Sequence, residues 1–107
     1  MDQSQNGIIN NLVPNEFFLS QNYPNPFKEK NTIKYCLAYK TDVELTIYNS
    51  LGKIIERLVR QDQDAGTYEI EFSAKSLYTG NYFYRIKAGE FIQTKEMILN
   101  KNLFRDV

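Results

Sequence analysis

The chain has 107 residues, a length that suits one domain rather than two. Its 13 basic and 13 acidic residues give a formal net charge of zero, so the basic excess of a nucleic-acid-binding protein is missing and no nucleic-acid partner is expected. Histidine is absent, which removes the commonest general base and the commonest metal ligand. We therefore expect a domain with no catalytic residues, no metal site and no cofactor.

Cysteine content and hydropathy exclude two further classes of protein. A single cysteine, Cys36, cannot form an internal disulfide, so packing alone must stabilise the domain. No run of about 18 apolar residues occurs, and a membrane span is not expected. The first ten residues lack a basic stretch followed by an apolar one, so they do not form a signal peptide. If the protein is exported, its signal peptide must lie elsewhere in a longer chain.

The N-terminal part divides into a linker and an opening segment. Residues 1–15 are rich in Asn and Gln and show no periodicity, which predicts a flexible linker. The segment FFLSQNYPNPF occupies positions 17–27. Its two prolines fix their own φ angles, withhold two backbone donors and keep the residue between them out of the helical region. We expect an extended or turning segment here, with Tyr23 and Phe27 as aromatic anchors.

The rest of the chain alternates between apolar and polar residues, the period of a β-strand. The alternating segments lie at 32–38, 42–49, 53–60, 67–73, 81–87 and 91–101. Turns are expected at Asn49–Gly52, with positive φ at Gly52, and at Ala88-Gly89, while residues 74–79 predict one short helical turn. About seven short strands separated by turns are typical of an antiparallel β-sandwich of the Ig-like or fibronectin-III-like kind, and we predict this all-β fold.

The alternation also predicts the core. Residues expected to point inward are Ile33, Tyr35, Leu37, Val43, Leu45, Ile47, Tyr68, Ile70, Phe72, Tyr82, Tyr84, Ile86, Met97 and Leu99. The segment 53–60 departs from this pattern, because it is apolar in patches on both faces. This indicates a β-bulge near Glu56–Arg57 that shifts the register.

One strand pairing is expected from loop length. The segments 53–60 and 67–73 are joined by a short polar loop, so we expect them to pair antiparallel. Lys53 and Arg57 would then face the two glutamates of the later strand across the ladder. Those glutamates, Glu69 and Glu71, lie on the solvent face of their strand. A solvated face is therefore a better interpretation of them than an acid–base pair, which needs a cleft.

Two other features have both a chemical and a structural interpretation. Asp62, Asp64 and Gly66 match the D-x-D-x-G spacing of a calcium loop, but Ser73 stands where the bidentate glutamate belongs. A polar hairpin loop is therefore favoured over a calcium site. Cys36 lies on the strand face opposite to the core, which favours an incidental small side chain over a reactive or dimer-forming thiol.

An aromatic cluster near the C-terminus raises the possibility of sugar stacking. The cluster comprises Tyr78, Tyr82, Phe83 and Tyr84. Alternation places Tyr82 and Tyr84 in the core and leaves only Phe83 and Tyr78 for the surface. Core packing is the favoured interpretation, and a carbohydrate-binding module of a larger secreted protein is kept as an alternative.

Several motifs, taken together, resemble a known family. They are LSQNYPNPF at 19–27, NTIKY at 31–35, IYNSLGK at 47–53, AGTYEIEF at 65–72, LYTGNYFYRIKAGEF at 77–91 and TKEMILNK at 94–101. Their order and combination resemble the C-terminal sorting domain, type A, of type IX secretion (Por secretion) cargo proteins. The resemblance implies a non-catalytic, Ig-like domain at the C-terminus of secreted proteins of Bacteroidetes and related bacteria.

The resemblance also implies partners, a location and a set of residues. The partners are the type IX translocon and a sortase-like C-terminal signal peptidase, with the domain covalently part of a larger cargo protein. The cargo passes through the periplasm and the outer membrane to the cell surface or the medium. The sorting domain is expected at 16–101 and a tail at 102–107. The sorting-motif candidates are Pro24, Asn25, Pro26, Phe27, Leu51, Gly52, Gly66, Tyr68, Gly80, Tyr82, Tyr84, Lys95, Met97, Leu99 and Lys101.

A structural role is the alternative to sorting. The LG turn and the G-x-YFYR run also resemble the Ig-like domain of the flagellar hook-capping protein, which is an accessory module. Position separates the two hypotheses, because an accessory module can lie within a chain whereas a sorting domain must be terminal.

Overall fold

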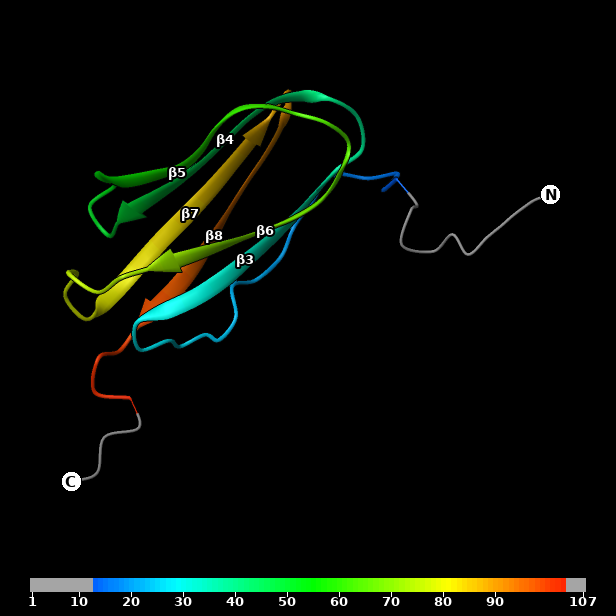
Figure 1. Cartoon of the computed structure of the whole chain (residues 1–107). Helices are drawn as coiled ribbons and strands as arrows, with labels where there is room; N and C mark the ends of the chain where they lie inside the picture. Colours follow the sequence, from blue (N-terminus) through cyan, green and yellow to red (C-terminus); the bar gives the residue numbers. More distant parts are fainter. Residues whose placement is uncertain (1–12, 104–107) are drawn as a thin grey trace.

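Two antiparallel sheets make up the computed structural model, which describes residues 13–103 (Figure 1). The strands of the described part are β2 (Phe18–Leu19), β3 (Lys30–Leu37), β4 (Thr41–Asn49), β5 (Ile54–Gln63), β6 (Gly66–Ser73), β7 (Gly80–Ala88) and β8 (Phe91–Leu99). One sheet has the order β2-β3-β6 and the other β5-β4-β7-β8. Residues 13–103 contain no helix. The predicted all-β sandwich is confirmed, whereas most of the predicted linker and of the tail lies outside the described residues.

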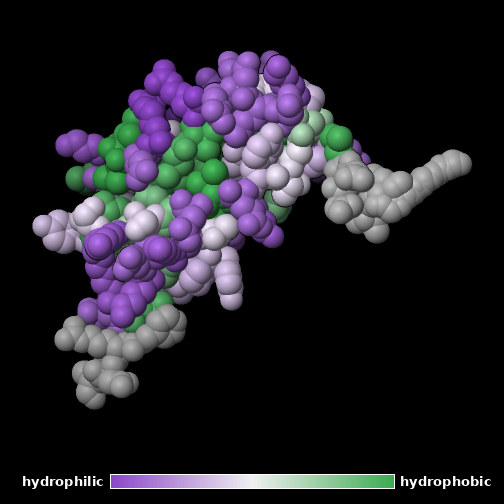
Figure 2. Space-filling view, in the orientation of Figure 1, coloured by the Kyte–Doolittle hydropathy of each residue, from purple (hydrophilic) through white to green (hydrophobic). Residues whose placement is uncertain are grey.

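The core lies between the two sheets, on the faces that alternation predicted. Of the fourteen residues expected inside, twelve are buried, and only Tyr68 and Ile70 are partly exposed. Burying one large apolar side chain contributes about 1.5–3 kcal/mol, so this alternation is the main source of stability. Figure 2 shows hydrophobic residues gathered in a band between the sheets, with hydrophilic residues along the rims.

The predicted pairing of residues 53–60 with 67–73 is wrong. β5 pairs with β4 in one sheet, whereas β6 pairs with β3 in the other. The short loop between them carries the chain from one layer to the next. Two tyrosine hydroxyls fix this corner, because Tyr35 donates to Gln63 Oε1 at 2.6 Å and Tyr68 donates to the Asp64 carbonyl at 2.7 Å.

The expected ion pairs change with the pairing. Glu69 contacts Lys34 of β3 at 3.2 Å rather than a residue of β5. Among residues 13–103, the residue of β5 that forms an ion pair is Arg60, whose Nε lies 3.7 Å from Glu44 of β4. These side chains are solvent-exposed, so each pair contributes about 1 kcal/mol at most.

The predicted irregularity in β5 is confirmed. The register against β4 shifts twice, and the shifts leave Leu58 and Ile55 as extra residues on either side of Glu56 and Arg57. Such bulges bend an edge strand and discourage pairing with another chain.

The turns largely match the sequence signals. Gly52 has a φ of 84°, and the Asn49 side chain accepts hydrogen bonds from the backbone N–H groups of Leu51 and Lys53, both at 2.9 Å. The β7–β8 turn lies one residue later than predicted, at Gly89 and Glu90. Residues 74–79 form a single hydrogen-bonded turn, not a helical one.

Candidate recognition site

A segment near the N-terminus lies along the outer edge of the last strand. We call residues 20–27 the opening strap; Figure 1 shows this part of the chain beside β3 and β8. Phe27 forms an isolated parallel bridge with Leu99. Its N–H donates to the Ile98 carbonyl at 2.9 Å, and its carbonyl accepts from the Asn100 N–H at 2.8 Å. The strap therefore satisfies main-chain groups that an edge strand would otherwise leave unpaired.

Two side chains of the strap extend this contact along β8. The side-chain oxygen Oδ1 of Asn25 accepts from the Ile98 N–H at 2.8 Å. Gln21 Nε2 donates to the Glu96 carbonyl at 2.7 Å. Asn25 stands between two prolines whose peptide bonds are both cis, and its side chain takes the place of a backbone acceptor. Gln21 was missed in the sequence, because no periodic signal marks a polar residue that bonds to a distant backbone.

A buried tyrosine fixes the start of the strap to the second sheet. The hydroxyl of Tyr84, on β7, donates to the Ser20 carbonyl at 2.6 Å and accepts from the Asn22 N–H at 2.7 Å. Tyr84 is fully buried, and this burial raises the pKa of its phenol to about 12, although the Asn22 bond opposes the shift. The phenol thus stays protonated and can serve both bonds at once.

The candidates on β7 and β8 lie next to this contact. Directly opposed pairs in the register are Gly80 with Leu99, Tyr82 with Met97, and Tyr84 with Lys95. The chain beyond β8 is held as well, because the Lys101 N–H donates to Thr79 Oγ1 at 2.9 Å and its ammonium donates to the Lys75 carbonyl at 2.7 Å. The structure therefore brings together the opening motif and the closing motif.

The remaining candidates lie apart from the strap. Leu51 and Gly52 form the tip of the β4–β5 turn, where Leu51 is 89% exposed. Gly66 pairs with Leu37 at the far end of β3, and Tyr68 stacks on Tyr35 with ring centroids 5.2 Å apart. The fifteen candidates are consequently not one contiguous site.

The aromatic cluster does not form a sugar-stacking platform. Tyr82 and Tyr84 are buried, as alternation predicted, and Phe83 is half-buried. Tyr78 is 88% exposed but lies in the loop before β7, where its carbonyl accepts the Tyr82 hydroxyl at 2.7 Å.

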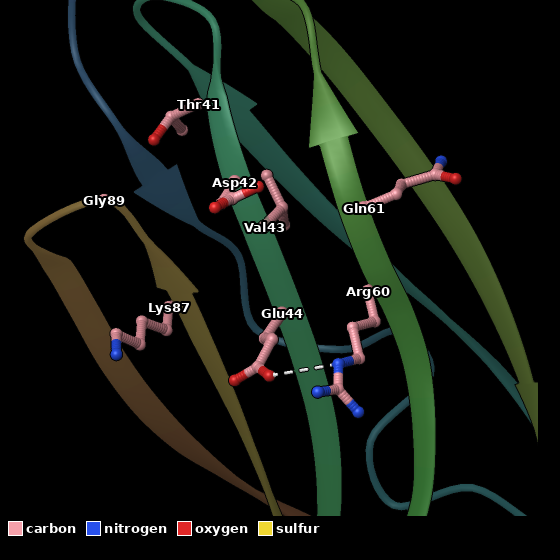
Figure 3. A pocket seen from close by; sticks show the side chains of 8 residues that line it. All are labelled: Thr41, Asp42, Val43, Glu44, Arg60, Gln61, Lys87 and Gly89. Carbon is pink, nitrogen blue, oxygen red and sulfur yellow. Dashed lines mark ion pairs between the residues drawn. The ribbon is translucent and has the colours of Figure 1, made fainter.

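A hollow of about 460 Å³ opens on the outer face of the four-stranded sheet (Figure 3). In it Glu44 pairs with Arg60, and Asp42 lies opposite Asp62 in the register. A hydrogen bond with Asp62, reinforced by its negative charge, raises the pKa of the exposed Asp42 carboxyl. No cluster of three or more potential metal-ligating side chains occurs within residues 13–103. The hollow is thus an open, solvated surface of mixed charge.

The fold and this site define a class: a small Ig-like sandwich module whose candidate site is a covered sheet edge, not a cleft. The chain matches the family described as the secretion system C-terminal sorting domain over residues 21–100, and it belongs to this family. The family is the sorting signal of type IX secretion, which exports proteins across the outer membrane to the cell surface or medium. Its domains are non-catalytic in general.

No curated protein and no solved structure matches the chain. In the described part of the chain, no helix has the length and apolar character needed to cross a membrane.

Proposed function

We propose that this chain is the sorting signal of a larger cargo protein. It catalyses no reaction itself, and the type IX translocon recognises it. The family match carries the proposal. Its limits coincide with the contact between strap and last strand: it begins at Gln21, which bonds to Glu96, and ends at Asn100, which bonds to Phe27. A fold that ties its first motif to its last strand presents both to a partner as one surface.

Nine of the fifteen candidate residues divide by burial into two proposed roles. Phe27, Tyr82, Tyr84, Met97 and Leu99 are buried, so they build the surface rather than contact a partner. Pro24, Asn25, Pro26 and Leu51 are exposed and available for recognition. We place the sorting unit at residues 16–101 and the tail at 102–107, and we propose that a sortase-like peptidase removes the unit from its cargo.

Placement within a fusion protein tests the proposal. Both fusions begin with a signal peptide. In the first, a fluorescent reporter precedes the 107-residue chain, and in the second, the chain precedes the reporter. In a type IX-competent host, we expect the reporter at the cell surface only when the chain is last. Periplasmic retention of both fusions would contradict the sorting role. Equal export of both would favour an accessory module carried by another signal.

A further inference from the structure

The two outward faces of the sandwich differ in character. The outer face of β3 and β6 is polar, and its central charges, Lys34 and Glu69, neutralise each other. The outer face of the four-stranded sheet instead carries a cross-strand row of Ile54, Tyr48 and Phe83, placed side by side by the register. On β8 this row ends with the exposed Glu96, which lies opposite Phe83. Apolar and aromatic residues that gather on a solvent-facing sheet surface do not contribute to the core, so they indicate an interaction surface.

A row of arginines lies beside this apolar row. Arg57, Thr46 and Arg85 are neighbours across β5, β4 and β7, and Thr46 is only 3% exposed although it faces outward. The guanidinium of Arg85 lies 5.4 Å from the centre of the Tyr48 ring. Both arginines are exposed, and neither has a carboxylate partner among residues 13–103. Their donors are therefore free to bind a carboxylate from outside.

A hollow of about 320 Å³ completes the surface. Its lining includes Tyr48, Phe83 and Arg85, together with the β4–β5 turn. Beside it, Leu51 is 89% and Ile54 45% exposed. The hollow is large enough for one apolar side chain, and the exposed Leu51 and Ile54 can contact the neighbouring residues of a bound segment.

We propose that an acidic segment of a protein partner docks on this face, which comprises the arginine row and the adjacent apolar row. The segment also carries apolar side chains. Carboxylates of the segment bind Arg57 and Arg85, and an apolar side chain enters the hollow. Charge complementarity selects an acidic partner, and Arg, Tyr and Phe are the residues enriched at protein interfaces. A polysaccharide is disfavoured, because the Arg85 guanidinium lies over the Tyr48 ring and Phe83 is half-buried, which reduces the ring area available for stacking. That the partner belongs to the export machinery rests on the proposed function, whereas the docking surface does not.

Nuclear magnetic resonance titration of the ¹⁵N-labelled 107-residue chain tests the docking directly. The probes are a short synthetic peptide that alternates glutamate with leucine and phenylalanine, the same peptide with lysine for glutamate, and polygalacturonate. We expect the acidic peptide alone to shift the amides of Thr46, Tyr48, Phe83 and Arg85. Higher salt should weaken its binding.

Two double variants distinguish binding at this surface from a general effect of net charge. Arg57→Glu with Arg85→Glu should weaken binding of the acidic peptide roughly tenfold or more. Lys40→Glu with Lys75→Glu changes the net charge equally at exposed loop positions and should leave binding within about twofold of wild type. The proposal is overturned if the shifts fall elsewhere, if both double variants bind alike, or if polygalacturonate binds and the peptide does not. The salt titration on the unaltered chain decides the question even if the arginine variant does not fold.

Discussion

Replacing Tyr84 with phenylalanine tests how the strap is held. The substitution keeps the ring and nearly the same volume, so it opens no large cavity. It removes the hydroxyl that donates to the Ser20 carbonyl and accepts from the Asn22 N–H, and Asn22 is only 2% exposed. Two hydrogen bonds are lost and at least one buried donor is left unsatisfied, so we expect a loss of about 2–4 kcal/mol in the free energy of unfolding.

Urea denaturation measures this loss. For a domain of this size the free energy of unfolding falls by about 1–3 kcal/mol per molar urea, so the urea midpoint of Tyr84→Phe should lie roughly 1–2 M below that of the wild type. Tyr23→Phe is the matched control. Tyr23 also belongs to the strap, but the expectation that it anchors this segment is wrong, because it is 79% exposed, so its change should be within about 0.5 kcal/mol. Amide exchange should also accelerate at Ile98 and Asn100 in Tyr84→Phe. If Tyr84→Phe and Tyr23→Phe unfold at the same urea concentration, the strap is not held by this hydroxyl.

Three further predictions concern the core, a turn and alkaline pH. Phe27→Ala removes a fully buried ring and should cost about 3–5 kcal/mol, measured by thermal unfolding; a loss below about 1 kcal/mol would contradict the buried anchor. Gly52→Ala should cost about 1 kcal/mol because φ is +84°, although nothing lies within 4 Å of the added Cβ; an unchanged urea midpoint would argue against this turn geometry. Burial raises the pKa of both Tyr35 and Tyr84 from 10.0 to about 12, so the unfolded chain loses these protons first. The free energy of unfolding should therefore keep this contribution below pH 10 and fall as the pH rises toward 12. Urea midpoints that do not decline over this range would refute the raised pKa values.

Alternation predicted the core well because it reports directly which side of a strand a residue occupies. Tyr35, Leu45 and Tyr84 are all fully buried, as their positions in the pattern required. The same pattern does not report which sheet a strand joins. β5 and β6 are close in sequence, yet they lie in different layers, because a short loop serves equally well as a hairpin or as a crossing between sheets.

The strap shows a second limit of the sequence. The two prolines predicted an extended segment but not its position against β8. Asn25 bonds to Ile98, which is 73 residues later in the chain, and Gln21 bonds to Glu96. Both side chains bond to backbone atoms, which every residue offers, so no property of the target residues reveals the pairing. The motifs at the two ends of the domain were found by family resemblance, and only the fold shows that they are in contact.

Dependence on the translocon tests the sorting account most directly. The measurement is the fraction of a reporter, fused ahead of this chain, that protease removes from intact cells of a type IX-competent host and of the same host without its translocon. The account predicts protease-accessible reporter in the competent host and protected, periplasmic reporter in the deficient one. Equal accessibility in the two hosts would contradict it.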